Sequence, residues 1–96
     1  MSPLKRKKLS KIRSELDKLD NSFIRLIKKR TNLVKKVLAL KENKSQIVDK
    51  KRIKMILSNI KKKSLKNNID PKITNRIWKN MIWSYIDYER RNFKKK

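Results

Sequence analysis

A repeating stripe of apolar residues in the first 40 positions constrains the fold more than any other feature of this chain. Apolar side chains recur at alternating steps of three and four, the spacing that places them along one face of an α-helix. This stripe, called the seam below, consists of Leu9, Ile12, Leu16, Leu19, Phe23, Leu26, Leu33, Val37 and Leu40. A helix of about 30 residues or more is roughly 45 Å long or longer, and a single chain of 96 residues is too small to cover it. We therefore expect a second copy of the chain to cover part of the seam.

Two shorter helices are predicted after a polar interruption that follows the seam. Asp49 is suited to cap the first of them, and its apolar pattern fades at Asn67 and Asn68. Asp70 followed by Pro71 favours the start of the other, because Asp accepts hydrogen bonds from free amides and Pro suits the first helical turn. The apolar sides of these helices are Ile53, Ile56, Leu57 and Ile60, and then Ile73, Ile77, Trp78, Met81, Ile82 and Tyr85.

The fold class is therefore all-α, with one long and two shorter helices in a single domain over residues 1–96. The absence of Gly supports this prediction, because tight turns are scarce in such a chain. The basic ends, residues 1–8 and 94–96, are expected to be frayed tails. No run of 18 apolar residues is present, so we expect a soluble, cytoplasmic protein with no membrane partner.

The composition also limits the chemistry. Cysteine and histidine are absent, which excludes disulfides, thiolate metal sites, cysteine nucleophiles and a histidine base. We expect no metal and no cofactor. The formal charge of +23 favours nucleic acid as a partner, since so strong a positive field attracts phosphates. Its alternative explanation is an AT-rich codon bias, which enriches Lys, Asn and Ile together.

Arg30 interrupts the seam at a position that should face inward. Burial of an unpaired guanidinium costs several kcal/mol, so an anion should meet it. The anion is either an acidic side chain, in a purely structural coiled coil, or an external ligand, and only eight acidic residues face 31 basic ones. Lys41 lies three turns further, roughly 16 Å along the axis, so the two cations could hold opposite ends of a small molecule. Arg13 lies too far along the same helix, roughly 25 Å from Arg30, but it could reach the site from an antiparallel partner.

Two charged residues on the shorter helices are also candidates. Arg52 flanks the apolar stripe of the second helix, and Glu89 continues the apolar face of the third. A Glu on such a face either pairs with one of the many Lys side chains or takes part in a site.

These residues together resemble the all-helical AroQ class of chorismate mutases, over about residues 9–93. The resemblance rests on residues 12–20, on Arg30 and Lys41, on the segments 49–52 and 69–71, and on a helix that ends near Glu89. It implies an intertwined antiparallel homodimer of three-helix protomers with two identical sites. The implied activity is the Claisen rearrangement of chorismate to prephenate in phenylalanine and tyrosine biosynthesis.

The resemblance also implies roles for single residues. Arg13 of the partner protomer and Arg30 would bind the substrate carboxylates, and Lys41 would contact the ether oxygen and a carboxylate. Glu89 would donate a hydrogen bond to the ether oxygen, which it can do only when protonated. Activity should then fall as the pH rises, and Glu89→Gln should flatten this dependence. The remaining implied pocket residues are Asp49, Arg52, Ile53 and Tyr85.

Two positions depart from the usual pattern of the family. Ile53 stands where the family commonly has Glu, and Tyr85 where a small polar residue is common. Both are similar to the isochorismate pyruvate-lyase branch of the same fold, which produces salicylate and pyruvate. The mutase is our first hypothesis, the lyase is the alternative, and a basic nucleic-acid-binding helical protein is the second alternative. The positions of Arg13, Arg30 and Lys41 along an apolar seam favour an enzyme, since a nucleic-acid binder needs cations only on an exposed face.

Overall fold

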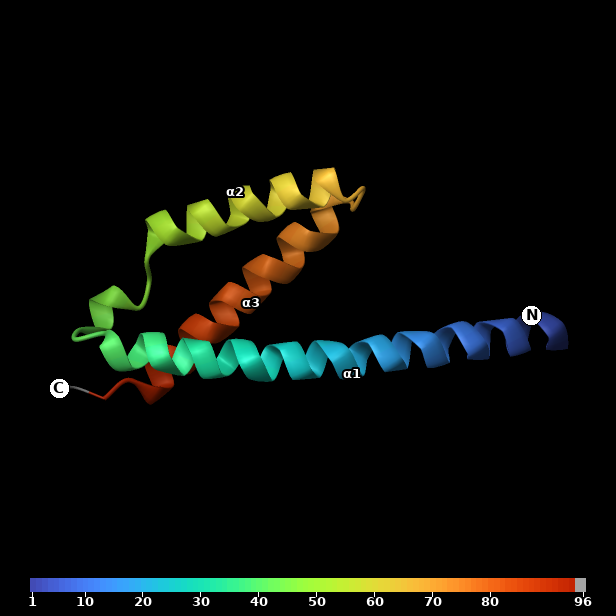
Figure 1. The fold of residues 1–96 in the computed structure, drawn as a ribbon, viewed down its shortest axis with the longest axis horizontal. Helices are drawn as coiled ribbons and strands as arrows, with labels where there is room; N and C mark the ends of the chain where they lie inside the picture. The colour runs from blue at the N-terminus through green and yellow to red at the C-terminus, as the bar shows by residue number, and fades with distance from the viewer. Residues whose placement is uncertain (95–96) are drawn as a thin grey trace. The chain divides into compact units, whose positions relative to one another are not determined.

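The computed structural model describes residues 1–94, and over them the fold is entirely helical (Figure 1). Helix α1 spans Pro3–Leu40, the short 3-10 helix η1 spans Lys44–Gln46, α2 spans Lys50–Lys66 and α3 spans Pro71–Asn92. The predicted all-α class, with one long and two shorter helices, is confirmed. None of the helices within residues 1–94 is both long and apolar enough to cross a membrane.

The chain divides into two compact units, the first formed by Met1–Leu33 and the second beginning at Val34. In the first unit, α1 begins at Pro3, so residues 3–8 are helical where we expected a frayed tail. The local reason is a start signal at Ser2, whose hydroxyl accepts a hydrogen bond from the amide of Lys5 at 3.2 Å, followed by Pro in the first turn. Of the expected C-terminal tail, Lys94 follows α3, and residues 95 and 96 lie outside the described residues.

The seam of the first unit is uncovered. Six of its residues keep 53–61% of their surface exposed, namely Ile12, Leu16, Leu19, Phe23, Leu26 and Leu33. None of the 38 residues of α1 is buried. This part of the helix therefore lacks the packing that normally stabilises a helix in water.

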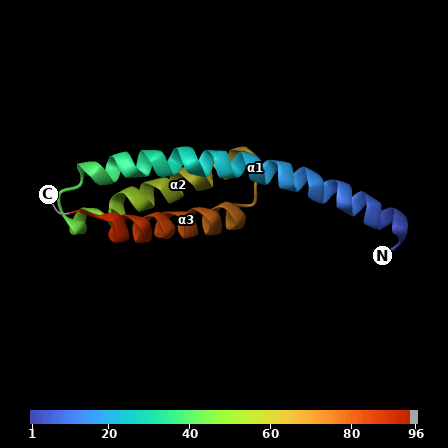
Figure 2. The ribbon, with the colours of Figure 1, turned by 90° about the horizontal axis from the view of Figure 1, so that it is seen from below.

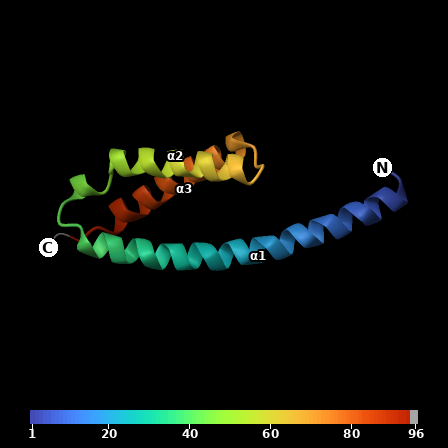
Figure 3. The same cartoon turned by 45° about the horizontal axis from the view of Figure 1, so that its top comes forward.

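In the second unit, α2 and α3 pack against each other as a helical hairpin (Figures 2 and 3). The Asp49 carboxylate accepts a hydrogen bond from the Arg52 amide at 3.0 Å, and that of Asp70 accepts one from the Lys72 amide at 2.9 Å. Both predicted helix starts are thus confirmed, and Pro71 stands in the first turn of α3.

A left-handed residue ends α2. Asn68 has φ of 56°, and the amide of Ile69 donates to the carbonyl of Ser64 at 2.9 Å, while the amide of Asn68 donates to that of Leu65 at 3.3 Å. This is the Schellman arrangement of a helix end, which normally favours Gly and sometimes takes Asn. It turns the chain toward α3.

Four residues of the described chain are buried, and all belong to the second unit: Ile47, Ser64, Ile86 and Glu89. The hydroxyls of Ser64 and Thr74 are 2.7 Å apart and join α2 to α3. Ser64 also donates to the carbonyl of Ile60 at 2.6 Å, so the buried hydroxyl is fully paired. The remaining buried polar residue, Glu89, belongs to the candidate site.

Candidate active site

Lys41 lies just beyond the end of α1. The helix ends at Leu40, and the amide of Lys41 makes a final tight bond to the carbonyl of Leu38 at 3.1 Å. Val34, Leu38 and Lys41 are partly buried, whereas the seam residues Val37 and Leu40 remain 50% and 80% exposed. The face of α1 that turns inward in the second unit therefore lies beside the seam and is distinct from it.

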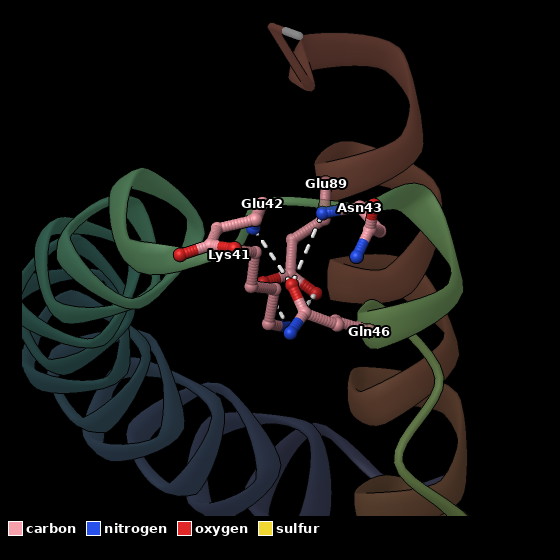
Figure 4. Close-up of polar contacts among 5 residues, drawn as sticks. All are labelled: Lys41, Glu42, Asn43, Gln46 and Glu89. Atoms are coloured by element: carbon pink, nitrogen blue, oxygen red, sulfur yellow. Dashed lines mark hydrogen bonds and ion pairs between the residues drawn. The ribbon is translucent and has the colours of Figure 1, made fainter. Parts of the chain in front are cut away.

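The Lys41 ammonium points at the carboxylate of Glu89 on α3 (Figure 4). Its Nζ donates to Oε1 at 3.0 Å and to Oε2 at 3.2 Å. The side chains are only 17% and 7% exposed, so the pair is largely shielded from water. The interaction is correspondingly less screened than an ion pair on the surface.

Glu89 had two interpretations, a salt bridge to a lysine or a member of the site. In the free chain the structure shows the salt bridge, and the lysine is the one we had assigned to the same site. The two interpretations therefore concern one pair of residues. Chemically, the arrangement presents a cation and a carboxyl group next to each other in a place from which most water is excluded.

A residue that the sequence reasoning missed holds the turn after Lys41. The side-chain oxygen of Gln46 accepts hydrogen bonds from the amides of Glu42, at 2.6 Å, and Asn43, at 3.0 Å (Figure 4). The signal was present, since Asn followed three residues later by Gln is the pattern of a helix-capping box. We had considered this segment only as an interruption of the apolar pattern.

The remaining candidates of the second unit lie at the start of α2 and on α3. One oxygen of Asp49 is occupied by the cap of α2, and Arg52 is exposed, with its Nη1 3.9 Å from the sulfur of Met55. Ile53 and Tyr85 are both partly buried, on α2 and α3 respectively. The membership of these residues in the site stays a prediction.

Arg13 and Arg30 belong to the first unit, where both are exposed on α1. The ion pairs among residues 1–94, Lys41 with Glu89 and Arg91 with Asp87, both lie in the second unit, so neither arginine has an acidic partner within the first unit. Within the first unit, Arg30 therefore lacks the internal counter-charge that the purely structural hypothesis requires. The same residues contain no group of three or more His, Cys, Asp or Glu side chains that could hold a metal ion.

Comparison with known proteins gives the family. Residues 12–90 match the family model of chorismate mutase type II. The chain belongs to the chorismate mutase type II family. It is 34% identical over 76 residues to the chorismate mutase of Methanocaldococcus jannaschii, an alignment that covers 78% of this chain and 77% of that protein. No solved structure matches the chain.

The match to the chorismate mutase type II family confirms the resemblance inferred from the sequence. The matched region extends from before Arg13 to beyond Glu89, so it includes all eight candidate residues. It also includes the turn between α1 and α2 that carries Lys41 and Gln46.

Proposed function

We propose that the protein is a chorismate mutase, an isomerase that converts chorismate to prephenate. The observation that carries the proposal is the shielded pair of Lys41 and Glu89 in a chain of this family. Prephenate would then serve phenylalanine and tyrosine biosynthesis.

The reaction suits a chain without His or Cys. A Claisen rearrangement breaks the ether C–O bond and forms a C–C bond within one molecule, so it needs no nucleophile and no net proton transfer. It needs the enolpyruvyl arm folded over the ring, which is an effect of orientation. It also needs positive charge or hydrogen-bond donors at the ether oxygen, which becomes negative as the bond breaks.

Lys41 is the residue that we propose for this stabilisation. Its ammonium carries three donors, and the two contacts to Glu89 leave capacity for a substrate oxygen. A fixed ammonium in a shielded place stabilises negative charge more strongly than one in bulk water. Lys41 would thus strengthen its interaction as the C–O bond breaks.

Glu89 would change its role when the substrate binds. As a carboxylate it can only accept hydrogen bonds, and in the free chain it accepts two from Lys41. Donation to the substrate requires the protonated form of the side chain. Protonated Glu89 can donate a hydrogen bond to the ether oxygen alongside Lys41.

A homodimer would complete the site. The uncovered seam on α1 is apolar except at Arg30, and burial of each Leu, Ile or Phe contributes about 1.5–3 kcal/mol. A second copy of the chain carries the same seam, so two antiparallel α1 helices can cover each other. This arrangement would bring Arg13 of one chain toward the site of the other.

The remaining residues receive roles consistent with their chemistry. Arg30 would bind one substrate carboxylate, and Arg13 of the partner the other, since a guanidinium matches a carboxylate with two parallel hydrogen bonds. Asp49 and Arg52 would lie near the ring hydroxyl. Ile53 and Tyr85 would provide the apolar and aromatic wall of the pocket.

The test is to offer the purified protein chorismate and isochorismate separately. Chorismate loss is followed by ultraviolet absorbance and salicylate formation by fluorescence. We expect prephenate formation that Lys41→Ala abolishes. The matched control is Lys44→Ala, because Lys44 is an exposed lysine of the same turn.

Each contrary outcome has a definite meaning. Faster formation of salicylate than of prephenate would replace the mutase by a lyase. Inactivity with both substrates would refute the proposal. Equal losses in Lys41→Ala and Lys44→Ala would remove Lys41 from the mechanism.

A further inference from the structure

We infer that Gln46 is a positioning residue for Lys41: its side-chain oxygen fixes the turn after α1 and thereby holds the Lys41 ammonium in place. The catalytic consequence rests on the proposed function of Lys41, whereas the contact itself does not. Gln46 is exposed, so its role is not explained by packing of its own side chain.

The turn over residues 41–46 needs this support because α1 ends at Leu40. The hydrogen bonds that Gln46 makes within this turn are called the Gln46 brace below. The amide of Lys41 still bonds to Leu38, but the next two amides, of Glu42 and Asn43, have left the helix. The Gln46 oxygen accepts from both of these amides, at 2.6 and 3.0 Å. One side chain thus fixes the orientation of two successive peptide groups directly after Lys41.

The backbone of Gln46 also bonds back to the start of the turn. The amide of Gln46 donates to the carbonyl of Asn43 at 3.1 Å, and the next residue, Ile47, is 4% exposed. Residues 42–46 are therefore joined by three hydrogen bonds and anchored at one end by a buried side chain. The anchor keeps Gln46 in place, and Gln46 keeps the start of the turn in place.

Lys41 depends on this turn because its side chain is long. The ammonium stands at the end of four flexible carbon atoms, and its position at Glu89 is set by the direction in which the backbone leaves α1. A displacement of about 1 Å at a catalytic group can lower a rate by roughly 100-fold. Among residues 1–94, Gln46 is the side chain that accepts hydrogen bonds from the amides next to Lys41.

The experiment compares Gln46→Met, which keeps the length but removes the acceptor, with Gln46→Glu, which keeps an acceptor oxygen. We expect Gln46→Met to lower kcat by about 10- to 100-fold with a smaller change in KM, because the contact of Lys41 to the ether oxygen strengthens in the transition state. Gln46→Glu should retain kcat within about threefold. Both variants should keep the helical circular dichroism of the unmodified protein, since Gln46 is exposed.

A double variant tests whether Gln46 acts through Lys41. Gln46→Met added to Lys41→Ala should lower kcat no further than Lys41→Ala alone. Three results would overturn the inference. The kcat of Gln46→Met could stay within twofold of that of the unmodified protein, or the Met and Glu variants could lose kcat equally. The third result is a double variant in which the two losses of kcat multiply.

A second measurement separates this inference from the proposed function. Hydrogen exchange of the Glu42 and Asn43 amides should be slowed in the unmodified protein and in Gln46→Glu, and fast in Gln46→Met. These rates need no substrate. If the exchange rates are as expected but the protein is inactive toward chorismate, the proposed function is refuted and the role of Gln46 in the turn is retained. Fast exchange of these two amides in the unmodified protein would overturn the Gln46 brace itself.

Discussion

Lys41→Met should destabilise the fold by an amount that the burial of Glu89 sets. Met has a similar length and an apolar side chain, so the change removes the ammonium with little change of volume. Glu89, 5% exposed, would then keep a carboxylate without its counter-charge. Removal of one partner from a buried ion pair costs about 3–5 kcal/mol, and the partial exposure of Lys41 places the expected loss at about 3 kcal/mol. Domains of this size unfold with about 5–15 kcal/mol, so the variant should still fold.

The assay is urea unfolding at one fixed protein concentration, followed by the fluorescence of Trp78 and Trp83 on α3. The matched variant is the double replacement Lys41→Met with Glu89→Leu, which removes both charges. We expect the double variant to recover most of the lost stability, because an apolar pair can replace a buried ion pair at little cost.

The reasoning would be refuted by two results. One is a loss below about 1 kcal/mol in Lys41→Met, which is the range of a surface ion pair. The other is a double variant that is no more stable than Lys41→Met, which would mean that the unpaired charge of Glu89 is not the source of the loss.

Three further predictions address the seam, the end of α2 and the donor role of Glu89. Leu19→Lys should dissociate the dimer in analytical ultracentrifugation, because it places a charge in the proposed interface, whereas Lys18→Ala should not; a Leu19→Lys protein of unchanged mass would contradict the interface. Asn68→Val should lower the free energy of unfolding by about 1–2 kcal/mol, since φ of 56° suits neither a branched side chain nor most others, whereas Asn68→Gly should be neutral or stabilising; equal stability of the two variants in urea would contradict this. Glu89→Gln should keep the mutase activity, because an amide N–H can donate to the ether oxygen; loss of kcat in this variant would remove Glu89 from the donor role.

The sequence predicted the helices well because their start and stop signals are local. Asp49 and Asp70 each accept hydrogen bonds from amides two or three residues away, so a short stretch of sequence contains the whole interaction. The start of α1 was missed although Ser2 and Pro3 gave the same kind of signal, because the basic charge of the segment suggested a tail.

The site was only partly predictable, since its contacts join distant positions. Lys41 and Glu89 are 48 positions apart, and with 31 basic residues in the chain, nothing in the sequence selects Lys41 as the partner of Glu89. The family resemblance named both residues but gave each a role toward the substrate. Their mutual contact in the free chain required the structure.

The inward face of α1 was not predicted either. Val34 and Leu38 lie one position beyond the seam residues Leu33 and Val37, so the two apolar stripes merge in the sequence pattern. Only the exposed fractions separate the stripe that packs within the chain from the one that remains uncovered. Homodimer formation, and with it the place of Arg13, stays a prediction.

The uncovered seam has a consequence for how the amount of active enzyme depends on synthesis. The first unit contains none of the buried residues of the described chain, so under the proposed dimer its final packing waits for an encounter between two molecules. Such an encounter is second order, and at low concentration the number of dimers rises with the square of the number of chains. Halving the supply of chain would then remove about three quarters of the dimers in this dilute regime. A cell that makes this protein would thereby obtain a steep response of flux to expression without any allosteric site.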